Sequence, residues 1–154
     1  YTSREKIPVR GRYLAADPAG GTLQTDQRPR ICRLTPDWLD TVAAHYEMTG
    51  SAGADLPYLM ERLEKGWMFG AFLNGQLAGF AGMHTEGSIG FLTVLPEYRR
   101  RGIGGALETY LINEMTERGF TPYGQIEEGN TGSVRLQESL GLCFSKEKIF
   151  WLQR

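Results

Sequence analysis

The sequence predicts a mixed α+β domain built around a mostly antiparallel sheet. Strand-like runs flank Asn74-Gly75, a dipeptide that supplies the positive φ angles of a type I′ turn and therefore predicts a β-hairpin. A second turn at Glu86-Gly87 adds a third antiparallel strand. A helical run beginning at residue 103 then leads to a further strand-like segment, and a helical crossover of this kind joins parallel strands.

Residues 1–29 are expected to form an N-terminal arm or linker, because prolines and glycines are frequent there and hydrophobic periodicity is weak. The chain begins with Tyr1 rather than methionine, so we expect the arm either to pack on the domain or to continue from an upstream segment. The folded domain is predicted to span residues 30–154. Its first strand is the short alternating run 29–34.

Two helices are predicted next. Residues 35–37 have the composition of a helix start, with Thr35 as the N-cap and a proline in the first helical position. The inward positions of this helix are expected to be Leu39, Val42, Ala43 and Tyr46. After a break at residues 50–53, residues 57–65 predict a second short helix, which turns inward Leu59, Met60 and Leu63.

The remaining elements follow from the same patterns. Strands are predicted at residues 67–73, 76–83, 88–95 and 122–127, and residues 143–152 are predicted to form a final strand or a tight strand pair. The long helix from residue 103 ends at Arg118-Gly119, a cationic last turn followed by a glycine. One face of it carries Ile103, Leu107, Tyr110, Leu111 and Met115, and the other carries Glu108, Thr109, Asn113, Thr116 and Glu117. A last helix at residues 130–140 is predicted to turn Leu136 and Leu140 inward, and Ser133 and Gln137 to another face.

Length, charge and cysteine content limit the classes of protein. A chain of 154 residues is predicted to form a single core, and its 17 basic and 18 acidic residues give no overall field for nucleic acid or an anionic membrane. Cys32 and Cys143 are far apart and show no metal-ligand spacing, which predicts a reduced, cytoplasmic protein without a metal site. No apolar run approaches the ~18 residues of a membrane span. The first and last strands of the predicted sheet have edges that are able to pair between subunits, so the sequence does not decide between a monomer and a homodimer.

The most informative stretch runs from residue 90 to residue 107. It begins as a strand, passes through three arginines and three glycines at residues 99–105, and enters the long helix. A helix N-terminus reached through glycines directs unpaired backbone N–H groups at one point, so this turn predicts an anion site. Ala106-Leu107 excludes a P-loop, and Leu107 also excludes the dinucleotide fingerprint. A structural turn with a solvated basic cluster is the alternative.

Within this stretch, Arg99-x-x-Gly102-x-Gly104 closely resembles the coenzyme-A motif of the GNAT N-acetyltransferase superfamily. Residues 130–142 resemble the family's Asn-x-x-Ser/Ala-x-x-Leu-Tyr-x-x-x-Gly-Phe segment. The expected order of strands and helices over residues 30–152 is also that of the family. The stretch 135–141 and the ending 150–152 look like the glycine N-acyltransferase branch.

The resemblance implies the GNAT fold, a central mixed and mostly antiparallel sheet with helices on both faces and a V-shaped splay between the fourth and fifth strands. It implies acetyl-CoA as cosubstrate, with the pantetheine arm along the fourth strand and the pyrophosphate on the glycine turn. The residues implied in coenzyme binding are Leu92, Thr93, Val94, Arg99, Arg100, Arg101, Gly102, Ile103, Gly104, Gly105, Asn130 and Ser133. For Asn130, a helix cap or Asx-turn is the alternative role.

Two positions depart from the family pattern. Gln137 stands where many relatives have a tyrosine that protonates the leaving thiolate, and an amide cannot act as an acid. Gly90 stands where a carboxylate is common as the general base. The candidates for the base are Glu86 and His84, and further candidates nearby are Ser88, Glu127 and Glu128. A solvated turn residue and a strand surface residue are the structural alternatives for the first two.

The sequence therefore predicts an N-acetyltransferase that transfers an acetyl group from acetyl-CoA to a primary amine by direct attack in a ternary complex. A weak base deprotonates an α-amino group of pKa about 8 more readily than a lysine ammonium of pKa about 10.4. The acceptor is therefore predicted to be an amino acid or another small amine. A non-catalytic acyl-CoA sensor or interaction module, and a nucleotide-binding protein that does not use coenzyme A, are the alternative hypotheses.

Overall fold

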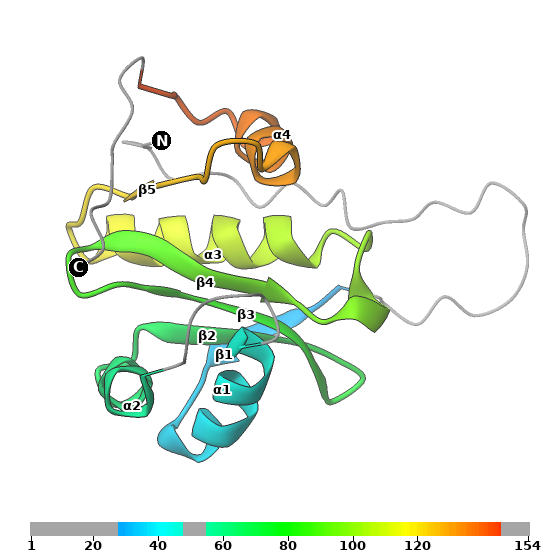
Figure 1. Cartoon of the computed structure of the whole chain (residues 1–154), viewed down its shortest axis with the longest axis vertical. Coiled ribbons are helices and arrows are strands. Elements are labelled where there is room, and N and C mark those ends of the chain that lie inside the picture. The colour runs from blue at the N-terminus through cyan, green and yellow to red at the C-terminus, as the bar shows by residue number, and fades with distance from the viewer. Residues whose placement is uncertain (1–27, 48–54, 146–154) are drawn as a thin grey trace, which may run out of the picture.

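The computed structural model describes residues 28–47 and 55–145, and every structural statement below concerns those residues (Figure 1). Three predictions fall wholly or mainly outside them. These are the arm at residues 1–29, the break at residues 50–53 and the final strand at residues 143–152, of which only residues 143–145 are described.

The sheet has five strands in the order β1-β2-β3-β4-β5, and the bounds of the strands are Arg30–Arg33, Met68–Leu73, Gln76–Met83, Ser88–Val94 and Tyr123–Gly124. Neighbours from β1 to β4 are antiparallel, and β5 is parallel to β4. The predicted hairpin is confirmed, because Asn74 and Gly75 have φ angles of 50° and 78°. Strand β5 is much shorter than the predicted run at residues 122–127.

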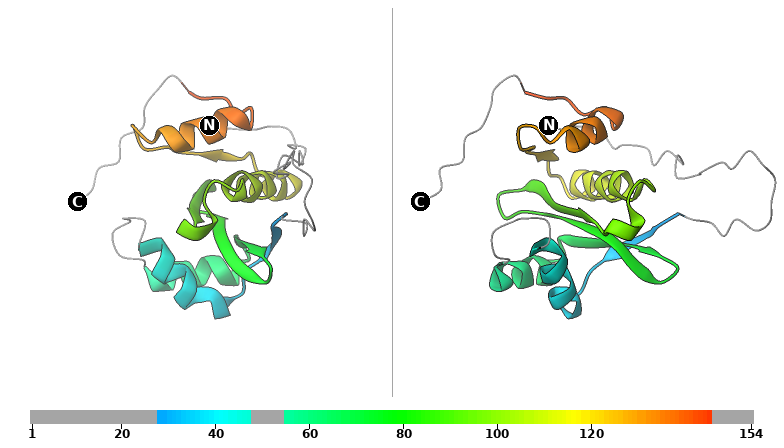
Figure 2. Two further views of the ribbon diagram at one scale, coloured as in Figure 1. Left: turned by 90° about the vertical axis from the view of Figure 1, so that its right-hand side faces the viewer. Right: turned by 45° about the vertical axis from the view of Figure 1, so that its right-hand side comes forward.

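Helices cover both faces of this sheet (Figures 1 and 2). Helices α1 (Leu39–Glu47) and α2 (Leu56–Glu64) lie on one face, where Val42 and Leu63 pack around Phe80 in one apolar cluster. Helix α3 (Ile103–Glu117) lies on the other face in a second cluster, and helix α4 (Thr131–Ser139) follows β5 on the far side of α3. The mixed α+β architecture and the helices on both faces are thus as predicted.

The starts of the first two helices differ from the prediction in their capping. Thr35 precedes a short 3₁₀ turn, η1 (Pro36–Trp38), and its side chain caps no backbone N–H group. Its hydroxyl instead lies 3.5 Å from the carboxylate of Asp37. Helix α2 is capped by Asp55, whose Oδ1 accepts from the Tyr58 N–H at 3.3 Å. This cap starts α2 at residue 56, one position before the prediction.

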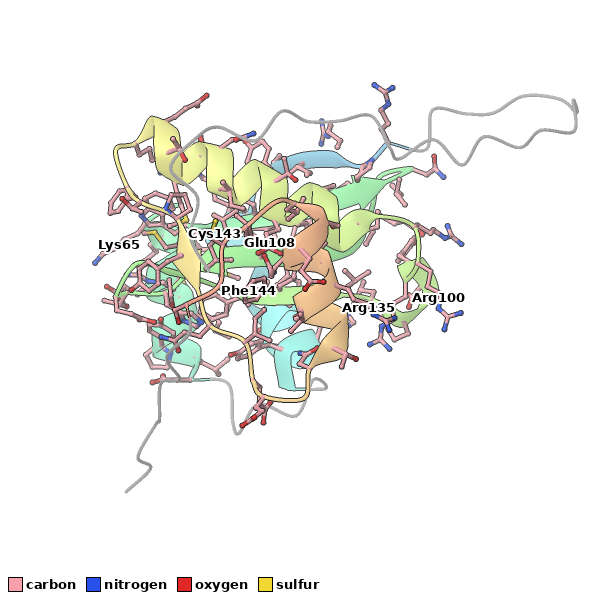
Figure 3. The ribbon with its side chains drawn as sticks, turned by 90° about the horizontal axis from the view of Figure 1, so that it is seen from above. Lys65, Arg100, Glu108, Arg135, Cys143 and Phe144 are labelled. Atoms are coloured by element: carbon pink, nitrogen blue, oxygen red, sulfur yellow. The ribbon has the colours of Figure 1, made fainter. Side chains whose placement is uncertain are left out.

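Helix α3 is buried on both of its faces. The apolar face is confirmed, since Leu107, Leu111 and Met115 have no exposed surface. The second face also lies largely inside, because Glu108 is 0%, Thr109 3% and Asn113 8% exposed. Figure 3 shows Glu108 between α3 and α4, so the later helix covers one of the polar residues that the sequence pattern alone places opposite the core.

A buried polar pair joins α3 to α4. Gln137 is 2% exposed and is buried more deeply than Leu136 and Leu140, the two residues predicted to point inward. Its Nε2 donates to Glu108 Oε2 at 2.8 Å, while its own Oε1 is buried without a hydrogen-bond partner. Leu140 does pack against the core as predicted, but the burial of Gln137 was not predicted. A hydrogen bond to the carboxylate on α3, rather than apolar spacing, orients the side of α4 that bears Gln137.

We expect Gln137→Leu to lower the free energy of unfolding by about 1–3 kcal/mol, because a buried carboxylate then loses one of its donors. The double variant Glu108→Leu/Gln137→Leu is expected to recover most of this loss, since both polar groups are then gone. Urea unfolding measures both. Ser139→Ala, which removes an exposed hydroxyl from the same helix, is the matched control. A double variant less stable than Gln137→Leu would contradict the prediction.

Candidate functional site

Strands β4 and β5 pair at one end only. The parallel register joins Ser88 to Tyr123 and Ile89 to Gly124, after which β4 continues to Val94 and β5 has ended. Figure 1 shows the chain leaving β5 toward α4 while β4 runs on beneath α3. The backbone edge of β4 beyond Ile89 is thus not paired with β5, which is the splay that the family resemblance implies. An extended ligand with its own amides matches such an edge.

A β-bulge interrupts β4 within this open part. Phe80 pairs with Thr93 and Gly82 pairs with Gly90, so that residues 91–92 lie opposite the single residue Ala81. Phe91 has a φ of 58°, a conformation that a bulky residue rarely adopts. A bulge takes its extra residue out of the hydrogen-bonded ladder. One of residues 91 and 92 is therefore left without a pairing partner on β3, beside the open edge.

The glycine turn opens the N-terminus of α3 at the end of this edge. Arg100 and Gly102 have φ angles of 61° and 76°, and Gly102 is the N-cap residue. No side chain caps α3, and its first intrahelical bond runs from the Ala106 N–H to the Gly102 carbonyl at 3.0 Å. The N–H groups of residues 103–105 consequently have no partner within the helix and carry its positive dipole end.

Two glycines bring α4 against this helix end. A Cβ on Gly104 would lie 3.6 Å from Val94 Cγ2 and 3.7 Å from Leu136 Cδ2, and one on Gly105 would lie 3.5 Å from Leu136 Cδ1. The end of β4, the start of α3 and the middle of α4 therefore meet at one point. The structure brings together the two sequence motifs that were identified separately.

Four arginines lie around this point. Arg99, Arg100 and Arg101 are exposed, and Figure 3 shows Arg100 at the same end of the molecule as Arg135 of α4. Arg99 Nε donates to the Val94 carbonyl at 3.3 Å, which holds the turn against the end of β4. The guanidinium of Arg101 lies 5.7 Å from the ring centre of Tyr98. Arg135 was not among the predicted site residues, because its position follows from the packing of Leu136.

Asn130 is the N-cap of α4, as the alternative interpretation held. Its Oδ1 accepts from the Ser133 N–H at 3.1 Å, and both residues lie in the first turn of a helix that starts at Thr131. This bond uses the oxygen of the Asn130 amide and leaves its Nδ2 group out of the cap. A contact of Asn130 or Ser133 with a ligand stays a prediction.

His84 fills the space that the missing side chain of Gly90 leaves on β4. A Cβ built on Gly90 would overlap His84 Nε2, so the imidazole lies directly over that backbone. The ring centre of His84 is 4.2 Å from that of Phe91, the bulge residue. The structure thus places an imidazole beside the position where the family commonly has a carboxylate. It is partly buried and is no simple strand surface residue.

The environments of His84 and Glu86 differ. Burial is the main cause that lowers the pKa of His84, and the positive charge of Arg62 adds to it, while Glu86 acts in the opposite direction. For Glu86, burial acts to raise the pKa, but a 2.6 Å hydrogen bond from Ser88 and further interactions lower it overall. His84 is therefore neutral at pH 7 and able to accept a proton, whereas Glu86 is ionised and a weak base.

Tyr58 and Arg62 of α2 join this group, and sequence analysis did not identify them. The Tyr58 hydroxyl lies 2.9 Å from His84 Nδ1 and accepts from the Thr85 N–H at 3.2 Å. Arg62 is 3% exposed, and its guanidinium carbon is 5.9 Å from the Tyr58 ring centre. Tyr58 is 26 residues from His84 in sequence, so only the packing of α2 on the sheet brings them together.

Two kinds of site are not found among residues 28–47 and 55–145. No helix there combines the length and apolar character that a bilayer crossing requires. No group of three or more His, Cys, Asp or Glu side chains in these segments is arranged to hold a metal ion.

The chain belongs to the acetyltransferase (GNAT) family, whose model matches residues 34–142. A sheet opened beside β4, with a glycine turn at the N-terminus of α3, is the arrangement that the resemblance of the two motifs predicted. The GNAT part of that prediction is confirmed.

Individual relatives match at lower coverage. The ribosomal protein bS18-alanine N-acetyltransferase of Escherichia coli (strain K12) is 36% identical over 72 residues, which cover 44% of this chain and 49% of that protein. The chain thus spans about half the length of the curated relatives it matches.

Solved structures show the same fold. The aminoglycoside N-acetyltransferase AAC(6')-Iy in complex with CoA has a TM-score of 0.70 at 20% identity, with 86% of this chain and 99% of that chain covered. The ribosomal-protein-S18-alanine N-acetyltransferase from Escherichia coli has a TM-score of 0.63 at 24% identity, with 73% and 76% covered. At these identities the likeness is one of fold.

The lowered pKa of His84 predicts a pH dependence of stability. The unfolded chain takes up a proton on His84 near its ordinary pKa of about 6.5, while the folded protein still holds the ring neutral. Stability is therefore expected to fall as the pH drops below that value. Urea unfolding of the wild type and His84→Gln between pH 7.5 and pH 5.5 measures it, with His45→Gln as the control for loss of the other histidine. An equal pH slope in wild type and His84→Gln would contradict the assignment.

Proposed function

We propose that the chain is an acyltransferase that moves an acetyl group from acetyl-CoA to a primary amine of a small molecule or amino acid. One observation carries the proposal: the unpaired edge of β4 ends at the open N-terminus of α3, with Val94, Gly104 and Leu136 in contact distance. An extended chain of amides and a diphosphate are the two parts of one ligand that such a junction suits.

The residues present fit coenzyme A. Gly104 and Gly105 lack side chains where the N–H groups of residues 103–105 face outward, so a phosphate is able to approach the backbone. Arg99, Arg100 and Arg101 add positive charge around the turn. We assign the backbone groups of residues 92–94 to the pantetheine arm, and we assign Nδ2 of Asn130, which the helix cap does not use, to bind the same arm from α4.

Acetyl-CoA would supply the activated acyl group, and coenzyme A would leave as the thiolate. We assign His84 Nε2 as the base that takes a proton from the attacking amine, because it lies over Gly90 beside the bulge and is neutral. A backbone N–H at residues 92–94 stabilises the oxyanion as the amine nitrogen bonds to the acyl carbon and the C–S bond breaks. Glu86, with its lowered pKa, is the weaker candidate base.

The departing thiolate has no acid at residue 137. Gln137 is able to donate a hydrogen bond but not a proton, and its Nε2 is already bonded to Glu108. A thiol resembling cysteine has a pKa of about 8.5, so it leaves as an anion and takes a proton from water. The proton balance closes without an acid, since His84 releases its proton to solvent.

We infer that the acceptor presents an α-amino group or another weakly basic amine. A single imidazole of lowered pKa is a poor base for a lysine ammonium of pKa about 10.4 and an adequate one for an α-amine of pKa about 8. The names of the two kinds of relative, which acetylate ribosomal protein alanine and aminoglycosides, support an amine acceptor. The glycine N-acyltransferase-like branch stays a prediction from residues 135–141 and 150–152, and a single domain over residues 30–154 stays a proposal.

An acyl-CoA sensor is the second candidate function. Its support is the replacement of the family's tyrosine by Gln137 and of the carboxylate by Gly90. Binding of acetyl-CoA without release of free thiol in the presence of any amine would favour the sensor over the enzyme.

The first test is protection against heat by acetyl-CoA. A ligand at 100 times its Kd adds about 2.7 kcal/mol to stability, so acetyl-CoA is expected to raise the Tm and ATP to raise it far less. Gly104→Ala is expected to keep or raise the intrinsic Tm, because alanine favours the helix by ~1 kcal/mol and its Cβ meets no clash. The added Cβ should hold the phosphate away from the backbone N–H groups. Because a hydrogen bond to a charged group is worth ~1.5–3 kcal/mol, we expect acetyl-CoA binding to weaken about tenfold or more.

Thr116→Ala, at the other end of α3, is the matched control and should leave acetyl-CoA binding unchanged. Equal protection by ATP, or full acetyl-CoA affinity in Gly104→Ala, would overturn the coenzyme site.

The second test is the release of free thiol from acetyl-CoA with a panel of amines. His84→Gln is expected to lower kcat/KM for the amine by about 10²–10⁴-fold at pH 7, with acetyl-CoA protection unchanged. The loss in kcat/KM should become smaller as the pH approaches the pKa of the acceptor ammonium, because more of the amine is then already unprotonated. Undiminished turnover in His84→Gln, with a loss in Glu86→Gln, would move the role of base to Glu86.

A further inference from the structure

Tyr58 of α2 contacts His84 in two ways, although it lies on a different element. Its hydroxyl oxygen lies 2.9 Å from Nδ1. Its ring is parallel to the imidazole, with an interplanar angle of 5° and ring centres 6.1 Å apart. The same ring contacts Phe91 at 5.9 Å, so the ring of Tyr58 touches both His84 and the residue of the bulge.

We propose that Tyr58 is a positioning residue, which holds His84 in the tautomer with its proton on Nδ1 and its lone pair on Nε2 over Gly90. The proposal rests on the role assigned to His84 above and deepens it. An imidazole with one proton acts as a base only at its other nitrogen. A group that fixes the proton on Nδ1 therefore decides that Nε2 is the nitrogen that acts as the base.

One contact and one chemical requirement are consistent with Tyr58 as the acceptor in this hydrogen bond. The Thr85 N–H donates to the Tyr58 oxygen at 3.2 Å, and His84 Nδ1 lies 2.9 Å from the same oxygen. We infer that this oxygen accepts from both nitrogens, because His84 needs a free lone pair on Nε2 to act as the base. Both nitrogens of an imidazolium are donors, so Nδ1 keeps Tyr58 as its partner after Nε2 takes a proton. The ring thus changes charge without changing its hydrogen bond to α2.

Arg62 completes the arrangement one turn further along α2. It is 3% exposed, its Nε is buried without a hydrogen-bond partner, and one of its terminal nitrogens lies 3.1 Å from Glu61 Oε1. Its charge acts against the imidazolium, whereas the charge of Glu86 on the adjoining turn favours it. Tyr58 orients His84, and Arg62 together with burial keeps it neutral between proton transfers.

The decisive measurement is the tautomer of His84 in the full chain, by long-range ¹H–¹⁵N NMR correlation of the ring nitrogens. The chain has only 2 histidines, so His45→Gln assigns the signals. We expect neutral His84 to carry its proton on Nδ1 in the wild type. A proton on Nε2 would overturn the proposal without any variant, and it would do so whether or not the protein turns over acetyl-CoA.

Two variants separate orientation from charge. Tyr58→Phe keeps the ring and removes the acceptor, so we expect the Nδ1 preference to be lost, the pKa of His84 to fall, and kcat to fall about tenfold to a hundredfold. Arg62→Met removes the charge, so the pKa of His84 should rise while the Nδ1 tautomer is retained. Opposite pKa changes distinguish these effects from general loss of structure.

Tyr110→Phe is the matched control, because Tyr110 is also a partly buried tyrosine that packs on a phenylalanine, Phe69, on the other face of the sheet. It should leave the tautomer, the pKa of His84 and kcat unchanged. The KM for acetyl-CoA should be the same in all four proteins. If Tyr58→Phe keeps both the wild-type tautomer and kcat, Tyr58 has no positioning role. If the tautomer is as expected but no amine is acetylated, the enzyme proposal fails and the positioning of His84 stands.

Discussion

The site depends on one constraint, the short pairing between β4 and β5. Backbone N–H and C=O groups of a sheet need partners, and β5 supplies them only at Ser88 and Ile89. The remaining edge of β4 is available because the chain leaves β5 at Gly124 and returns as α4 against the start of α3. The bulge at Phe91 lies in this same part of β4. A ligand that brings its own amides to the edge would supply the missing partners.

Features encoded by neighbouring residues were predictable from sequence. The turn at Asn74-Gly75 and the end of α3 at Gly119 depend on positive φ angles, which those residues adopt at little cost. The glycine turn and its basic residues are contiguous, so the anion site was predicted as a unit. The shortness of β5 and the burial of Gln137 were missed, because each depends on a partner far away in sequence, such as Glu108.

The proposed coenzyme-binding part and the proposed acid–base part of the site also differ in how far the sequence predicted them. The proposed coenzyme-binding residues occupy two continuous motifs, whereas the proposed acid–base group comes from α2, from the turn before β4, and from β4 itself. In the sequence, Gly90 indicates only that the carboxylate common in the family is missing. In the structure its lack of a side chain provides the room in which His84 lies, an interpretation that becomes available only when both residues are seen together.

Because of this packing, the imidazole of His84 in its present position excludes a side chain at residue 90. Any side chain at residue 90 would overlap the imidazole of His84, so a carboxylate introduced there must displace the ring. An evolutionary or engineered exchange of one kind of base for the other therefore involves both positions, because a side chain at residue 90 requires the ring at residue 84 to move or to be replaced by a smaller group.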